Sequence, residues 1–123
     1  MTFSATRDVW NRAFHRSGGP APGPGDIALT ALVHLHKIKM IGGLGHAVAF
    51  LTTEEYYAGV TGYRYFGLEE IASVLEAAKL CGSDVSALEL LELRYNELVP
   101  SDDILTAAFE AVYKDSPNAF TPI

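Results

Sequence analysis

Apolar residues recur at intervals of three and four along most of the chain, and this spacing restricts the fold more than any other feature. The segment 68–80 is the clearest example, because its apolar residues share one helical face: Leu68, Ile71, Ala72, Leu75 and Ala78. No segment shows the strict alternation of apolar and polar residues that indicates a half-buried strand. No repeat with a period of about 20 to 50 residues is present either. The sequence therefore predicts an all-α fold.

Glycines, prolines and capping residues divide this pattern into six or seven short helices. The expected helices span residues 3–15, 27–41, 46–51, 54–60, 68–80, 85–98 and 104–113. Asp26 is the expected N-cap of the second helix, and Gly42-Gly43 predicts a tight turn between helices. Segment 17–25 holds three prolines and four glycines, which predicts an internal loop, and residues 116–123 are expected to fray. Segment 61–67 is either a helical end or an ordered loop.

The length and composition fit one compact domain covering residues 1–123. The chain is 49% hydrophobic and 20% charged, and at this length it should bury about two-thirds of its unfolded surface. Cys81 is the single cysteine, which excludes an intrachain disulfide and a cysteine-based metal cluster and suits a reducing cytoplasm. The apolar stretches are interrupted well before the roughly 20 residues of a membrane span. We therefore expect a cytoplasmic protein without a membrane helix or a secretory signal.

Charge is distributed unevenly along the chain. Up to Phe66 there are six Lys and Arg residues against four Asp and Glu residues, whereas from Gly67 onward there are three against eleven. The net charge of −6 is therefore the sum of a first part at +2 and a second part at −8. Such an acidic second part repels nucleic acid, whose binding depends on clustered cations. An acidic face can instead attract a basic protein, or it can simply keep the surface solvated.

No catalytic motif stands out in the sequence. Cys81 has no basic neighbour that would lower its pKa, and the glycines at 42–45 lack the lysine and the preceding strand of a phosphate-binding loop. Paired carboxylates such as Glu69-Glu70 and Asp102-Asp103 stand at expected helix starts, where they stabilise exposed backbone N–H groups. We therefore expect a non-enzymatic protein that needs no cofactor.

The acidic residues of the second part are the candidate partner-binding residues: Glu69, Glu76, Glu89, Glu92, Glu97, Asp102 and Asp103. They predict an acidic protein-interaction module whose partner is a basic protein, with a DNA-binding regulator as the specific candidate. Direct binding of nucleic acid is not expected.

Histidines and tyrosines support an alternative function, a helical domain that binds a small ligand or a metal. His34 and His36 point about 200° apart on a helix and cannot hold one ion together, but His46 could approach either one across the Gly42-Gly43 turn. The candidate pocket or interface residues are His34, His36, His46, Tyr56, Tyr57, Tyr63 and Tyr65. If the tyrosine rings are exposed, they indicate an interface, including one between two copies in a homodimer; if they are buried, they are core.

The order of several of these features resembles the helical domain family of a bacterial DNA-mimic protein. The shared features are Trp10 near the start, Asp26-x-x-Leu29, the Gly42-Gly43 break and Tyr63-x-Tyr65-Phe66-Gly67-Leu68. The resemblance covers residues 25–80, and Ile41 stands where the family pattern has Asn. It implies an all-helical, dimeric, non-catalytic protein whose carboxylates are spaced like DNA phosphates and occupy the DNA-binding face of a regulator.

Overall fold

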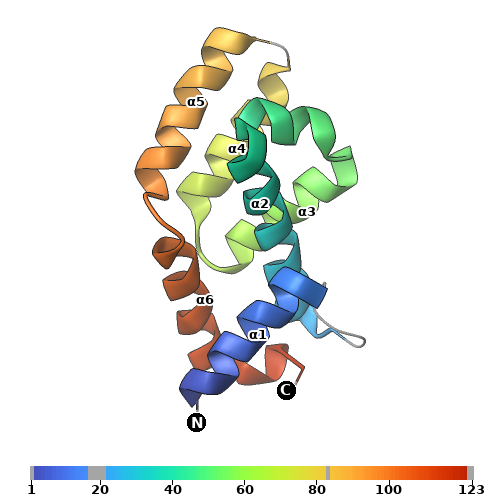
Figure 1. Ribbon diagram of the computed structural model, residues 1–123, viewed down its shortest axis with the longest axis vertical. Coiled ribbons are helices and arrows are strands. Elements are labelled where there is room, and N and C mark those ends of the chain that lie inside the picture. The colour runs from blue at the N-terminus through green and yellow to red at the C-terminus, as the bar shows by residue number, and fades with distance from the viewer. Residues whose placement is uncertain (1, 17–21, 83, 122–123) are drawn as a thin grey trace.

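The computed structural model describes residues 2–16, 22–82 and 84–121 (Figure 1). The helices in chain order are α1 (Thr2–Arg16), α2 (Pro24–Phe50), α3 (Thr53–Tyr65), α4 (Glu69–Cys81), α5 (Val85–Leu98), α6 (Asp103–Asp115) and the 3₁₀ turn η1 (Pro117–Ala119). The described residues contain no strand, so the predicted all-α fold is confirmed. The predicted loop at 17–25 falls partly outside the described residues, which resume at Pro22, and its last two residues belong to α2.

The central element of the fold is α2, which contacts α1, α3, α4, α5 and η1. In Figure 1, α1 crosses the lower part of α2, α5 stands to one side, and α6 continues below α5 towards α1. Both ends of the chain lie at the same end of the molecule (Figure 1). The largest side chains without solvent exposure form one core and come from nearly every helix: Val9, Leu29, Leu32, Leu35, Leu44, Tyr56, Val60, Tyr63, Leu75, Tyr95, Leu105 and Phe109.

The Gly42-Gly43 pair marks a kink inside α2. The helix extends from Pro24 to Phe50, and Gly43 departs from helical geometry with φ 90° and ψ 177°. A positive φ of this size is open to glycine and strained for residues with a Cβ. The predicted interruption between two helices is therefore confirmed, because two helical segments meet at Gly43 within α2. Residues after Gly43 continue as a short second segment of the same element.

The predicted N-cap Asp26 is wrong by three residues. Gly23 is the N-cap of α2, and Asp26 is the third residue of the helix, where its Oδ2 accepts a 2.9 Å hydrogen bond from the Gly23 N–H. Asp26 is also fully buried, and its Oδ1 accepts a 2.8 Å hydrogen bond from Arg12 Nη2 on α1. An acid that satisfies a helix N-terminus usually lies at the surface. Here the arginine compensates for its burial.

The predicted fraying from residue 116 is also wrong for the part of the tail that the structure describes. After η1, the Phe120 ring is only 3% exposed and its centroid lies 5.4 Å from that of Phe109 and 5.2 Å from that of Tyr113. The backbone of Thr121 donates a 2.7 Å hydrogen bond to Asp26. Residues 122–123 lie outside the described part of the chain. An aromatic anchor and a backbone contact thus fix this segment on α1, α2 and α6.

The segment 61–67 is the end of α3 followed by a turn. The helix continues to Tyr65, Phe66 caps it, and Gly67 turns the chain with φ 77°. This helix approaches α2 closely at Gly62, where an added Cβ would lie 2.4 Å from the carbonyl oxygen of Ala28. The absence of a side chain at Gly62 therefore sets the spacing between α2 and α3.

By length and composition, α2 is the one described helix that could cross a membrane. A central helix of a soluble protein passes the same test, and 44% of its most apolar window is buried inside the protein. It also carries the buried polar residues Asp26, His36 and Lys39, each of which has a polar partner on another element.

Candidate functional site

Most of the predicted partner-binding acids have polar partners on other residues of the same chain. Arg64, near the end of α3, contacts Glu69 at 2.9 Å and Glu76 at 2.5 Å on α4. These hydrogen bonds lower the pKa of Glu76, and the two carboxylates raise the pKa of Arg64. On α5, Arg94 lies 3.6 Å from Glu97. Each of these three acids therefore lies next to an arginine of the chain, which compensates its charge in part.

Glu92 is a structural acid that caps the kink of α2. Its Oε1 accepts a 2.6 Å hydrogen bond from the Leu44 N–H, which follows the non-helical Gly43, and its Oε2 lies 2.8 Å from Lys39 Nζ. Burial raises the pKa of Glu92, but the hydrogen bonds from Lys39 and Leu44 outweigh it, so the net pKa lies below the ordinary value. Lys39 is buried, and its ammonium lies 4.6 Å from the centroid of the Tyr95 ring. Glu92 thus joins α5 to both segments of α2.

Asp102 ends a chain of hydrogen bonds that runs into the core. Its Oδ1 lies 2.9 Å from His36 Nε2, His36 Nδ1 lies 2.7 Å from the Tyr95 hydroxyl, and that hydroxyl lies 2.6 Å from the hydroxyl of Tyr63. A carboxylate only accepts, so we assign the proton of neutral His36 to Nε2 and the acceptor role to Nδ1. Tyr95 then donates to His36 and accepts from Tyr63. Burial raises the pKa of both tyrosines.

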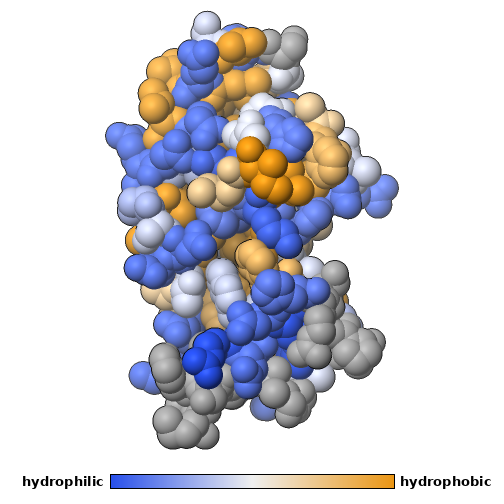
Figure 2. All heavy atoms as spheres, viewed as in Figure 1, coloured by the Kyte–Doolittle hydropathy of each residue, from blue (hydrophilic) through white to orange (hydrophobic). Residues whose placement is uncertain are grey.

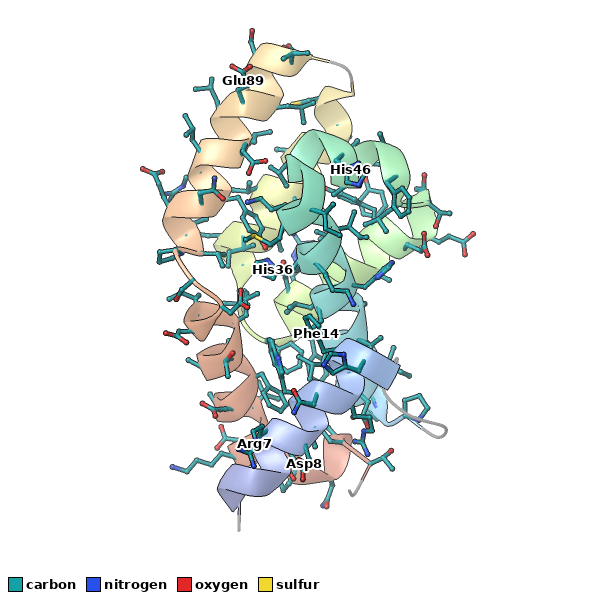
Figure 3. The ribbon with its side chains drawn as sticks, viewed as in Figure 1. Arg7, Asp8, Phe14, His36, His46 and Glu89 are labelled. Atoms are coloured by element: carbon teal, nitrogen blue, oxygen red, sulfur yellow. The ribbon has the colours of Figure 1, made fainter. Side chains whose placement is uncertain are left out.

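This series of buried hydrogen bonds has a structural role. Tyr63 and Tyr95 have no solvent exposure, and His36 is buried with its ring between α5 and the start of α6 (Figure 3). Each polar atom in this series of hydrogen bonds has a partner, which is the condition under which polar groups can be buried at low cost. The chain connects α2, α3, α5 and the start of α6.

The three candidate histidines do not converge. His36 lies in the core, whereas His46 lies at the far end of α2 and stacks on Phe50 with ring centroids 5.3 Å apart (Figure 3). His34 points from α2 towards Glu55 on α3, with 4.0 Å between Nε2 and Oε2. Among the described residues, no three His, Cys, Asp or Glu side chains are placed to hold a metal ion.

The four candidate tyrosines are divided between the core and the surface. Tyr56 and Tyr63 are fully buried, and the Tyr56 hydroxyl donates a 2.7 Å hydrogen bond to the carbonyl of Leu75. Tyr57 and Tyr65 are exposed over about a third of their surface. Two of the four candidate tyrosines are therefore core residues.

Glu89 and Asp103 are the two candidate acids whose side chains have no polar partner in the described part of the chain. Glu89 lies on α5, near the end of the molecule opposite the two termini (Figure 3). The same helix exposes Leu90 and Leu93, at 69% and 62% of their surface. The side of α5 that packs on α2 includes Glu92 and Tyr95, so residues 86, 89, 90, 93 and 97 form its opposite, solvent-facing side. We call this side the α5 outer face.

The α5 outer face combines apolar and acidic character. Figure 2 shows apolar residues along α5 with hydrophilic residues next to them. Single exposed apolar residues are normal on a protein surface, but two leucines at positions i and i+3 of one helix face form the pattern of a helix-mediated contact. Leu90 lies off the helical stripe formed by Leu88, Leu91 and Tyr95, so this signal is present in the periodicity of the sequence.

Comparison of the chain with protein-family models, with curated proteins and with solved structures gives no significant match.

Proposed function

We propose that this protein is a non-enzymatic, acidic protein-interaction module that contacts a basic partner through the α5 outer face. The observation that carries the proposal is the exposure of Leu90 and Leu93 on one face of α5, beside the unpaired Glu89. Burying a leucine side chain contributes about 1.5–3 kcal/mol, so the pair provides an apolar anchor of useful size. The partner in this proposal is a protein segment with apolar side chains and flanking Lys or Arg residues.

Charge supports the choice of a basic partner. Glu89, which has no polar partner among the described residues, lies beside the leucines, and the chain from Gly67 onward contains eleven acids and three bases. Acidic residues around an apolar anchor increase the rate of encounter with a cationic partner and disfavour acidic ones. Salt should therefore weaken the complex, because these charges are exposed to solvent.

Mimicry of DNA is the more specific form of the proposal. It requires several unpaired carboxylates on one surface, whereas Glu69, Glu76 and Glu92 have cationic partners within the chain. The remaining acids, among them Glu89 and Asp103, would have to provide the mimicry. A partner that releases this protein when duplex DNA is added would support DNA mimicry. A partner whose binding is unaffected by DNA would support only the general interaction module.

The test compares capture by matched surface variants. The immobilised protein, a Leu90→Ser/Leu93→Ser variant and a Met40→Ser control are exposed to the same native lysate, and bound proteins are identified by mass spectrometry. Met40 is a suitable control because it lies on α2 and is 63% exposed, like Leu93. We expect a basic protein that the wild type and the control retain and the double variant loses.

Affinity measurements with the captured partner complete the test. The double leucine variant should bind at least about tenfold more weakly, and Glu89→Lys should weaken binding further at low salt. The proposal is wrong if the double variant retains the same proteins as the wild type, or if binding is unchanged by Glu89→Lys and by salt.

A further inference from the structure

A groove between α1, α2 and α3 lies away from the α5 outer face. It has a volume of about 560 Å³, within the range of small-ligand sites. Phe14 on α1, Ile27, Thr30 and Lys37 on α2, and Glu55 on α3 are among the residues that line it. The groove is independent of the proposed function because none of the α5 residues contributes to it.

One wall of the groove carries two basic side chains. Lys37 and His34 are three residues apart on α2, so they share one helix face. The ammonium of Lys37 lies 4.4 Å from the centroid of the Phe14 ring and 3.4 Å from the Phe14 carbonyl oxygen. No carboxylate of the described residues lies within ion-pair distance of Lys37, in contrast to Lys39, which contacts Glu92 at 2.8 Å. An anion can therefore contact this ammonium without displacing a carboxylate.

The opposite part of the groove is apolar. Ile27 is 58% exposed although it lies in the first turns of the central helix, and Ala31 and Ala58 line the groove next to it. The Thr30 Oγ1 atom is buried and has no hydrogen-bond partner among the described residues.

We propose that this groove binds a small amphipathic monocarboxylate. The carboxylate contacts Lys37 and His34, and the hydrocarbon part covers Phe14 and Ile27. A single negative charge is repelled less than a phosphate dianion by Glu55, which lines the groove from α3 and whose Oε2 lies 4.0 Å from His34 Nε2. A cationic ligand is disfavoured, since it would approach the ammonium of Lys37.

The experiment is a titration of the full chain with octanoate, followed by two-dimensional amide NMR at neutral pH. Octanol and octylammonium, which have the same hydrocarbon chain with a neutral and a positive head group, are the comparison ligands. We expect saturable shifts at residues 14, 34 and 37, with octanoate binding more tightly than octanol and octylammonium binding least.

Three lysine variants separate a charge contact from a structural effect. Lys37→Met should weaken octanoate binding by about tenfold or more, and Lys37→Arg should retain it. Lys79→Met is the matched control, because Lys79 also lies over an aromatic ring, 5.5 Å from the centroid of Tyr56, and donates to a backbone carbonyl, that of Val48. It lies outside the groove and should leave octanoate binding unchanged.

A fourth variant tests the location of the hydrocarbon chain. Ala58→Phe places a ring in the groove without changing its charge, and it should abolish octanoate binding while the amide spectrum remains that of a folded protein. The inference is overturned if octanoate gives no saturable shifts at millimolar concentration. It is equally overturned if Lys37→Met binds as the wild type does, or if octylammonium binds as tightly as octanoate.

Discussion

Arg12 and Asp26 form a buried ion pair that connects α1 to the start of α2. The Arg12 Nη2 atom donates a 2.8 Å hydrogen bond to Asp26 Oδ1, and the two side chains are 7% and 0% exposed. Arg12 also donates to the Thr121 carbonyl at 2.6 Å, and Asp26 accepts from the Thr121 N–H at 2.7 Å. The pair therefore joins three parts of the chain, two of which are 95 residues apart.

Replacement of Asp26 by Ala should strongly destabilise the protein. It leaves the Arg12 charge buried and removes the acceptor for the N–H groups of Gly23 and Thr121, a combination that costs about 3–5 kcal/mol. Chemical denaturation followed by circular dichroism measures the change. Glu110→Ala, at an exposed position of α6, is the control and should change the free energy of unfolding by less than about 0.5 kcal/mol. Equal stability of the two variants would contradict the assigned role of the pair.

The central position of Tyr95 among the buried hydrogen bonds predicts an order of stability among tyrosine variants. Tyr95→Phe leaves both His36 Nδ1 and the Tyr63 hydroxyl without a partner, and it should cost about 1–3 kcal/mol or more. Tyr63→Phe removes only the terminal donor, so its cost should be nearer 0.5–1.5 kcal/mol. Denaturation of both variants and of the double variant measures these values. A larger effect of Tyr63→Phe would contradict the central position of Tyr95 in this network.

Two glycines of the α2 and α3 region should respond oppositely to alanine. At Gly62 a Cβ would lie 2.4 Å from the backbone oxygen of Ala28, so Gly62→Ala should destabilise by about 1–3 kcal/mol as the two helices separate. At Gly45 the nearest atom would be Leu88 Cδ1 at 3.8 Å, so Gly45→Ala should stabilise by about 0.5–1 kcal/mol. Thermal unfolding distinguishes the two signs. A neutral Gly62→Ala variant would show that the close approach is not required.

The lowered pKa of Glu92 predicts a specific loss of stability in acid. Because the folded protein lowers this pKa below its ordinary value of 4.5, the contribution is present above that pH and is lost as the pH falls through the folded value. Glu92→Gln should therefore be less stable than the wild type near neutral pH, and the difference should shrink in acid. Denaturation at about pH 7 and about pH 3 measures it. Glu89→Gln should change stability little at either pH, and a similar pH-dependent difference there would contradict the prediction.

The helices could be predicted from the sequence because their signals are local. The spacing of Leu68, Ile71 and Leu75 predicted α4, and the glycine pair at 42–43 predicted the interruption of α2. Both depend on residues within a few turns of each other.

The partners of the polar residues could not be predicted, because they lie far away in the sequence. Glu92 resembled any exposed acid of an amphipathic helix, yet it meets Leu44 and Lys39, which are 48 and 53 positions away. A polar residue among apolar ones on α2, such as His36, indicates a buried network without naming its members. An acid with a structural role can therefore be told from a solvent-exposed one only when its distant cationic partner is known.

Helical periodicity, capping and charge are properties of neighbouring residues, so the all-α fold, the positions of most helices and the acidic character of the second half followed from the amino-acid order alone. Tertiary packing determined which polar residues are buried, which acids remain unpaired and which apolar residues of α5 face solvent. These properties depend on the packing of α2 against four other helices and on contacts between residues as distant as Asp26 and Thr121. Burial and pairing are set only when such elements meet, since each polar group is stabilised by the partner that the fold places next to it.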